Sequence, residues 1–238
     1  MKAHELYHAG KLDEAIESLS AELRSNPTDA QRRTFLFELL GFAGELDRAE
    51  KQLGVIAQGS PEAAMGAVLY QSALHAERIR QQMFLAGDYP RGPAPRPPSG
   101  TLNGVPFGAI QDGDPRIGAR LEVFAAGQYT WIPLEHIASV HLSAPKKLRD
   151  LLWAAATVRT GPGFKGVELG EVLIPIMAPL SWQHADDAVR LGRVTEWQEL
   201  EDGSQVPIGQ KLLLVDEEEF PILEVRELDL DPPPDTAG

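Results

Sequence analysis

The chain contains the segment Gly10-Lys11-Leu12-Asp13-Glu14-Ala15, which returns 34 residues later as Gly44-Glu45-Leu46-Asp47-Arg48-Ala49. Extending the alignment gives six identities in eighteen positions and adds two pairs, Leu19 with Leu53 and Pro27 with Pro61. A helical hairpin needs such residues: the glycine permits a tight turn, the alanine lets a partner helix approach closely, and the proline ends the unit. The recurrence therefore predicts two similar helical hairpins near the N-terminus.

Apolar residues recur at helical spacing throughout the first 85 residues. We expect helices at about residues 1–9, 12–24, 29–42, 46–57 and 62–85, the last of them started by Ser60-Pro61. A 34-residue period with glycine, alanine and proline in this order resembles the tetratricopeptide repeat. The alternative is a chance recurrence of a helix–turn–helix, because the hallmark tryptophan is absent and about two and a half repeats fit.

Stacked hairpins of this kind leave the first helix of each pair lining a concave groove. By repeat geometry we predict the partner-binding residues of that groove to be Tyr7, His8, Gln31, Thr34, Glu38, Phe42, Met65, Val68, Ser72 and His75. Aromatic residues and a methionine flanked by polar side chains suit an amphipathic helix laid in a groove. The alternative for Phe42 and Tyr7 is that they belong to the packed core.

Residues 86–104 contain five prolines and four glycines, a composition that cannot extend a helix. We therefore divide the chain into a helical domain at 1–85, a linker at 86–104 and a second domain at 105–230. The proline-rich tail at 231–238 is predicted to be disordered.

The second domain has the pattern of short strands separated by turn residues. The expected strands are 120–125, 128–133, 137–142, 167–176, 193–200, 210–215 and 220–228. Two short helices are expected between them, one at 148–153 after Pro145 and one at 184–191. The predicted fold class is α+β, with tetratricopeptide-like helical hairpins followed by a mainly-β domain that resembles a barrel or a sandwich.

Composition excludes several classes of protein. The 238 residues carry a net charge of −13 without a clustered basic surface, which argues against a nucleic-acid ligand. The absence of cysteine excludes disulfides, thiolate metal sites and a cysteine nucleophile. No run of 18 apolar residues or signal-peptide core occurs, so we expect a soluble, cytoplasmic protein without membrane insertion.

No catalytic or metal-binding motif emerges from the remaining residues. The loop Gly161–Gly166 lacks the lysine–serine ending of a phosphate-binding loop and favours a turn between strands. The segment Asp112–Arg116 matches a calcium loop for three residues and then departs from it. His4 and His8 could share a helix face without forming a known metal signature. We therefore predict no enzyme, no metal and no cofactor.

Several strings after the linker are similar to one protein family. They are residues 120–124, 129–133, 145–154, 186–193 and 195–197. Together with the helical N-terminus they resemble the ImpE/SciE family of type VI secretion accessory proteins, also called TagJ, over residues 1–230. The resemblance implies a bacterial cytoplasmic adaptor that binds the N-terminal helix of the small contractile-sheath subunit and is linked to the AAA+ ATPase that recycles the sheath. It carries over no catalytic residues.

On this interpretation the partner helix would place apolar residues against Phe42, Met65, Val68 and Tyr7, with Glu38 and Gln31 fixing its register. The placement comes from repeat geometry. One alternative is an enzyme or small-ligand site in the β-rich half, which would show a deep pocket with convergent polar groups and a perturbed pKa. Another is a general chaperone-like repeat protein unconnected with secretion, in which case neighbouring sheath and ATPase genes would be absent.

Overall fold

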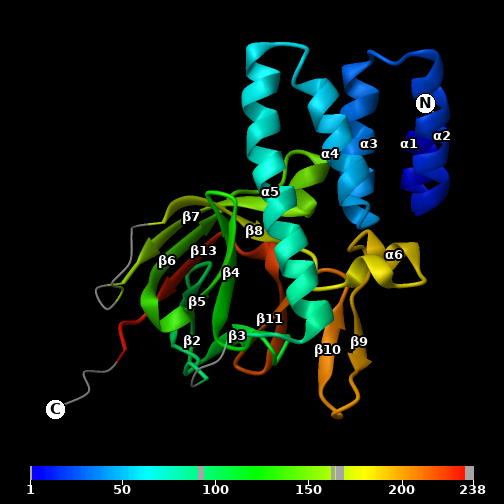
Figure 1. Cartoon of the computed structure of the whole chain (residues 1–238). Helices are drawn as coiled ribbons and strands as arrows, with labels where there is room; N and C mark the ends of the chain where they lie inside the picture. Colours follow the sequence, from blue (N-terminus) through cyan, green and yellow to red (C-terminus); the bar gives the residue numbers. More distant parts are fainter. Residues whose placement is uncertain (1, 91–93, 162–163, 165–168, 234–238) are drawn as a thin grey trace.

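The computed structural model describes residues 2–90, 94–161, 164 and 169–233, and its N-terminal part is a row of helices (Figure 1). Their bounds are Lys2–His8 (α1), Leu12–Ser25 (α2), Ala30–Phe42 (α3), Leu46–Ile56 (α4) and Pro61–Ala86 (α5). Each lies within about one residue of its expected range, because the apolar stripe and the end signals agree. In α5, for example, the Ser60 side chain accepts a hydrogen bond from the N–H of Ala63, and Pro61 occupies the first turn.

The glycines of the repeat occupy the helix–helix turns as expected. Gly10 and Gly44 have φ angles of +78° and +71°, a left-handed conformation that side chains with a Cβ disfavour. The turns bring α1 against α2 and α3 against α4 as antiparallel hairpins (Figure 1).

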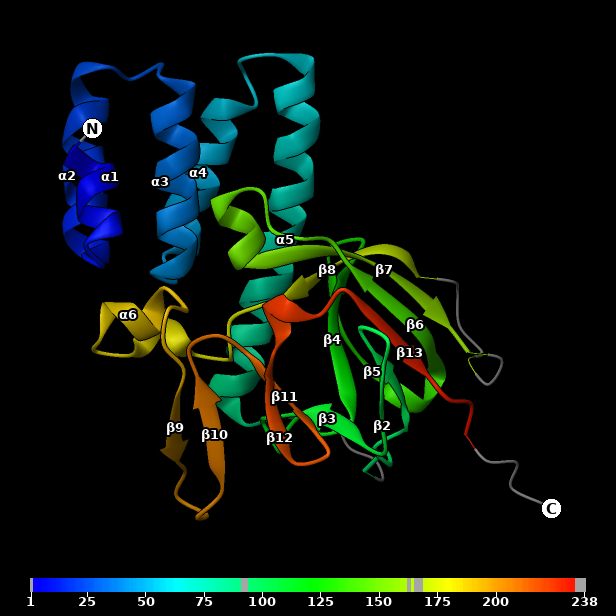
Figure 2. The same cartoon turned by 180° about the vertical axis from the view of Figure 1, so that it is seen from behind.

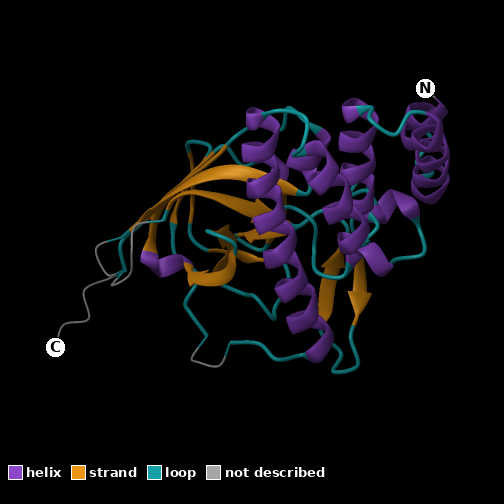
Figure 3. Ribbon diagram, turned by 45° about the horizontal axis from the view of Figure 1, so that its top comes forward, coloured by secondary structure: helices purple, strands orange, loops and turns teal. Residues whose placement is uncertain are grey.

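The rest of the chain is mainly antiparallel sheet, beside which α5 runs (Figure 3). The largest sheet has the order β2-β1-β13-β6-β7-β8-β4-β5, and two smaller sheets have the orders β10-β9 and β12-β11-β3. The strand bounds are Gly100–Leu102 (β1), Val105–Phe107 (β2), Ile110–Asp112 (β3), Arg120–Ala125 (β4), Gln128–Pro133 (β5), Ile137–Leu142 (β6), Trp153–Thr160 (β7), Gly170–Pro175 (β8), Glu196–Glu199 (β9), Gln205–Ile208 (β10), Leu212–Val215 (β11), Glu218–Pro221 (β12) and Glu227–Leu230 (β13).

The α+β class is thus confirmed, whereas the barrel or sandwich is not. Over the described residues, β2 and β5 form the two edges of the large sheet and do not pair with each other, so this sheet is open. Short helical turns connect the strands at Leu134–His136 (η1), Leu148–Leu151 (η2), Ser181–Gln183 (η3), Asp187–Arg190 (α6) and Ile222–Glu224 (η4).

The structure differs from the expected elements in several places. The strand expected at 220–228 is divided by η4 into β12 and β13, and no expected strand corresponds to β10. The helix expected at 148–153 is the single turn η2, and Trp153 already begins β7, which pairs with β6 and β8 on its two sides. Within the expected linker, β1 pairs with β13 and so joins the two ends of the β-rich half. The expected turn at Gly161–Gly166 lies mostly outside the described residues, as does the tail from residue 234.

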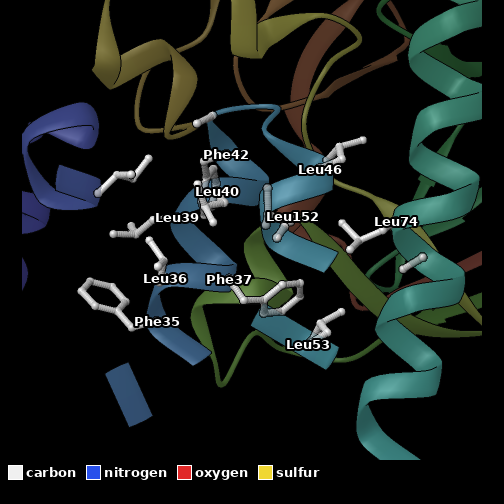
Figure 4. Close-up of a cluster of buried hydrophobic side chains, with 14 of the residues drawn as sticks. Phe35, Leu36, Phe37, Leu39, Leu40, Phe42, Leu46, Leu53, Leu74 and Leu152 are labelled. Atoms are coloured by element: carbon white, nitrogen blue, oxygen red, sulfur yellow. The ribbon is translucent and has the colours of Figure 1, made fainter. Parts of the chain in front are cut away.

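The two halves of the chain share one hydrophobic core. Phe37 of α3 and Leu74 of α5 belong to the same buried cluster as Leu152, Trp153 and Leu173 of the β-rich half. In Figure 4, Leu152 lies among side chains of α3 and α4. The proline-rich segment therefore connects two parts that are packed against each other.

The segment 180–193 lies beneath the turns of the helical hairpins (Figure 2). Trp182 contacts the α3–α4 turn so closely that a Cβ on Gly44 would lie 2.5 Å from its ring. The carboxylate of Asp187 accepts a hydrogen bond of 2.8 Å from the N–H of Leu12 at the start of α2. The guanidinium of Arg193 donates to the carbonyl of His8, at 3.1 Å, in the α1–α2 turn. These contacts fix the helices on the sheet.

Candidate protein-binding site

A groove of about 780 Å³ opens between α1, α3 and the segment 145–151, and we call it the α1–α3 groove. It is lined by His4, Tyr7 and His8 of α1, by Ala30, Gln31, Thr34, Phe35 and Glu38 of α3, and by Pro145, Lys146, Lys147, Leu148 and Leu151. Five of the predicted partner-binding residues are among them: Tyr7, His8, Gln31, Thr34 and Glu38.

Aromatic contacts fix the inner wall of this groove. The rings of His4 and Phe35 are stacked with their centroids 4.1 Å apart, and Tyr7 meets Phe35 edge-on at 5.8 Å. The guanidinium of Arg193 lies 4.8 Å from the centroid of the Tyr7 ring. Burial lowers the pKa of the His4 imidazole, which favours its neutral form in the stack. The wall is therefore held in place by α1, α3 and the segment after α6.

Glu38 lines the α1–α3 groove but faces a partner within the chain. Its carboxylate is buried and lies 2.8 Å from Nη1 of Arg149, and burial raises its pKa. The guanidinium of Arg149 also lies 4.9 Å from the centroid of the Tyr70 ring. The η2 turn therefore covers this part of α3, and the carboxylate that was expected to fix the register of a partner helix is paired with Arg149.

Phe42 does not line the α1–α3 groove and borders only a small cavity of about 30 Å³. Its side chain is 2% exposed and lies in the core cluster shared with Leu152, as Figure 4 shows. The packed-core alternative is therefore correct for this residue. The β-rich half therefore packs, through Leu152, against the C-terminal end of α3. Repeat geometry alone would leave this surface open.

Three of the four predicted residues of α5, Met65, Val68 and Ser72, line a separate groove of about 520 Å³, which we call the α5–sheet groove. Met65 and Val68 are 77% and 61% exposed there, and Ser72 lies beside Gly127 of the β4–β5 turn. His75 is exposed and lines neither groove. The single concave surface that we predicted is thus two grooves with the segment 143–151 between them.

A buried charge network that sequence reasoning missed joins α5 to the sheet. The Arg80 guanidinium donates to both carboxylate oxygens of Glu122 on β4, at 2.7 and 3.1 Å. Lys211 pairs with Glu122 and also with Asp112 on β3. All four side chains are buried. The one sequence signal is Glu122 itself, a charge within the apolar run 121–124.

The charges of this network perturb the pKa of both carboxylates. Desolvation alone would raise the pKa of Glu122, but Arg80 and Lys211 outweigh it and lower that pKa to about 2. Asp112 shares the same lysine without an arginine, and burial raises its pKa to about 6. The adjoining cavity of about 30 Å³ is large enough for one water molecule. The network therefore has the perturbed pKa values of an active site without room for a substrate.

The raised pKa of Asp112 gives a test by pH. A carboxyl whose folded pKa lies above its unfolded value contributes stability below about pH 4, and that contribution is lost as the pH rises through about 6. We expect the free energy of unfolding of the native chain to fall relative to that of Asp112→Asn between about pH 4 and pH 7. Urea unfolding of both proteins at the two pH values measures the difference, and a difference independent of pH would contradict the assignment.

The residues that suggested a calcium loop have other partners. Asp112 pairs with Lys211, and the carboxylate of Asp114 accepts hydrogen bonds from the N–H and the guanidinium of Arg116. Across the described parts of the chain, no three histidine, aspartate or glutamate side chains are placed to hold a metal ion. In the same residues, no helix is both long and apolar enough to cross a membrane.

Two comparisons decide the family. The family model described as ImpE protein matches residues 104–229. A protein of Pseudomonas aeruginosa named "Type VI secretion system accessory component TagJ" is 32% identical, over 98% of this chain and 92% of its own. The chain belongs to the ImpE family. The resemblance seen in the sequence strings is thereby confirmed.

A solved structure shows the same fold as this ImpE-family chain. The crystal structure of protein VPA1032 from Vibrio parahaemolyticus superposes with a TM-score of 0.83 and covers 97% of this chain and 98% of its own, at 22% identity. The helical half and the sheet are therefore a shared arrangement.

Proposed function

We propose that this chain is a non-enzymatic accessory protein of a bacterial type VI secretion system that acts in the cytoplasm as an adaptor. It binds the N-terminal helix of the small contractile-sheath subunit and links the sheath to the AAA+ ATPase that recycles it. The family membership and the printed name of the Pseudomonas relative support the secretion role. The observation that carries helix binding is the open α1–α3 groove.

The α1–α3 groove has the properties that helix binding needs. Its walls present apolar surface from Tyr7, Phe35, Leu148 and Leu151, and Gln31 and Thr34 add uncharged polar groups to the lining. An amphipathic helix places residues at three- and four-residue spacing against such a floor. The aromatic stack of His4 and Phe35 holds the floor in shape before the partner arrives, which reduces the entropy cost of binding.

The enzymatic alternative finds less support in the β-rich half. The perturbed carboxylates Asp112 and Glu122 are paired with cations of the chain, and the space beside them is too small for a substrate. The open grooves, by contrast, expose more apolar than polar surface. Protein binding accounts for these observations better than catalysis.

Replacing Thr34 with arginine is expected to weaken binding of the sheath-subunit helix by about tenfold or more, which is about 1.4 kcal/mol. The Thr34 hydroxyl donates to the carbonyl of Ala30, so the hydrogen bond that the replacement removes lies within α3. The longer side chain instead occupies the groove. Calorimetry with a peptide of the helix measures the change, and a micromolar dissociation constant, about −8 kcal/mol, is expected for the native chain.

The matched control is Val68→Arg, which places the same side chain in the α5–sheet groove. It should leave the affinity within about twofold of native. Weakening by Val68→Arg alone would assign the helix to the α5–sheet groove. Absence of binding by the native chain would contradict the proposed function.

A further inference from the structure

Building on the proposed function, we infer that the α1–α3 groove selects an amphipathic helix whose flank carries acidic residues, with Lys146 and Lys147 as the residues that recognise them. Both lysines line the groove, and both are exposed. The charge of the whole chain, −13, would favour the opposite partner, a basic helix. The local charge of the groove therefore favours an acidic partner, whereas the net charge of the chain favours a basic one.

The ammonium groups of Lys146 and Lys147 are the uncompensated charges of this groove. Neither forms an ion pair with another described residue. The acid that lines the groove, Glu38, is neutralised by Arg149 at 2.8 Å. His4, Tyr7, His8, Gln31 and Thr34 contribute no formal charge while the two histidines are neutral.

Acids near the groove are also engaged. Asp29, at the start of α3, accepts a hydrogen bond from the N–H of Arg32 and pairs with its guanidinium, and Glu22 of α2 pairs with the same arginine at 2.9 Å. An approaching acidic side chain would therefore meet the two lysines with little repulsion from the opposite wall. Such complementarity acts mainly on specificity and on the rate of association.

Asp150 fixes the position of the two lysines. Its Oδ2 accepts hydrogen bonds from the backbone N–H groups of Lys146 and Lys147, at 2.8 and 2.9 Å. Because Asp150 is half-buried and faces the backbone, the loop is held from within while the ammonium groups extend outward. The loop leads directly into η2, which Arg149 attaches to α3. Lys146 and Lys147 are thus held on a segment whose position is fixed by Asp150 and Arg149.

The inference is tested with two designed helical peptides that have the same apolar stripe and are flanked either by glutamate or by lysine. At about 50 mM salt, where screening is weak, the native chain should bind the glutamate-flanked peptide about tenfold more tightly. At about 500 mM salt the preference should shrink to about twofold or less. The double variant Lys146→Glu/Lys147→Glu should lose or reverse it, as measured by fluorescence anisotropy.

The matched control reverses the charge of two exposed basic residues elsewhere, with Lys51→Glu in α4 and Arg159→Glu in β7. It should keep the native preference. Equal binding of the peptides, a preference for the lysine-flanked one, binding of neither, or a preference that survives in the Lys146→Glu/Lys147→Glu variant would overturn the inference. A parallel measurement with the sheath-subunit peptide separates the two proposals. Acidic preference without sheath binding contradicts the proposed function alone, and sheath binding without acidic preference contradicts this inference alone.

Discussion

Replacing Glu122 with alanine is expected to lower the free energy of unfolding by about 3–5 kcal/mol, the usual cost of leaving a buried ion pair without one partner. Glu122 is 1% exposed and faces both Arg80 and Lys211. Its removal leaves two buried cations with Asp112 and Glu77 as the remaining nearby acids. Because Arg80 belongs to α5 and Lys211 to the sheet region, the loss weakens the junction of the two halves.

Urea unfolding followed by tryptophan fluorescence measures this loss. The matched control is Glu171→Ala, which removes an exposed glutamate from β8 of the same sheet and should change stability by about 0.5 kcal/mol or less. A loss of under about 1 kcal/mol in Glu122→Ala would show that the network contributes little to joining the halves.

Replacing Gly44 with alanine is expected to destabilise the protein by about 2–5 kcal/mol through two effects that add. The residue has a φ angle of +71°, where an L-residue is strained. Its new Cβ would also lie 2.5 Å from Cδ2 of Trp182, which forces the indole or the α3–α4 turn to move. The change should therefore disturb the contact between the hairpin and the segment 180–193.

Two comparisons separate strain from crowding. Gly87→Ala, at a φ of +64° with open space around the position, should show the strain alone, about 1–2 kcal/mol. In a Trp182→Ala background, the penalty of Gly44→Ala should fall to that same level, since the obstructing ring is gone. Thermal unfolding of the native chain, Gly44→Ala, Trp182→Ala and the double variant gives the coupling energy between the two positions. Equal penalties for Gly44→Ala in both backgrounds would contradict the contact.

The elements that sequence reasoning placed well are those whose signals are local. The helices follow from the stripe that starts at Leu12 and from end signals such as Ser60-Pro61, which depend on neighbours within a few residues. The strands 120–125, 128–133 and 137–142 have the expected bounds, because turn residues separate β-rich runs there.

The segment 148–153 shows where local signals fail. Leu148, Leu151 and Leu152 have helical spacing, yet the chain makes one turn and continues as β7 between β6 and β8. The alanines 154–156 have little preference for a strand of their own. Pairing with strands on both sides decides their conformation, and that pairing is a property of the whole sheet.

The candidate site could be predicted in part for the same reason. Repeat geometry placed Gln31 and Thr34 on a groove, because α3 presents the same face in any stack of hairpins. It could not show that Arg149, more than 100 residues away, would cover Glu38, nor that Leu152 would pack beside Phe42. These contacts divide the surface into two grooves, and they depend on how the second half docks.

The most direct test of the account is cross-linking from single positions within the assembled complex. A photoreactive residue at Gln31 lies in the α1–α3 groove, whereas one at Val68 lies in the α5–sheet groove and one at His75 lies outside both. The account predicts a cross-link from position 31 to the N-terminal helix of the small sheath subunit, and none from positions 68 and 75. A complex that forms but cross-links to that helix from position 68, or from none of the three, would contradict it.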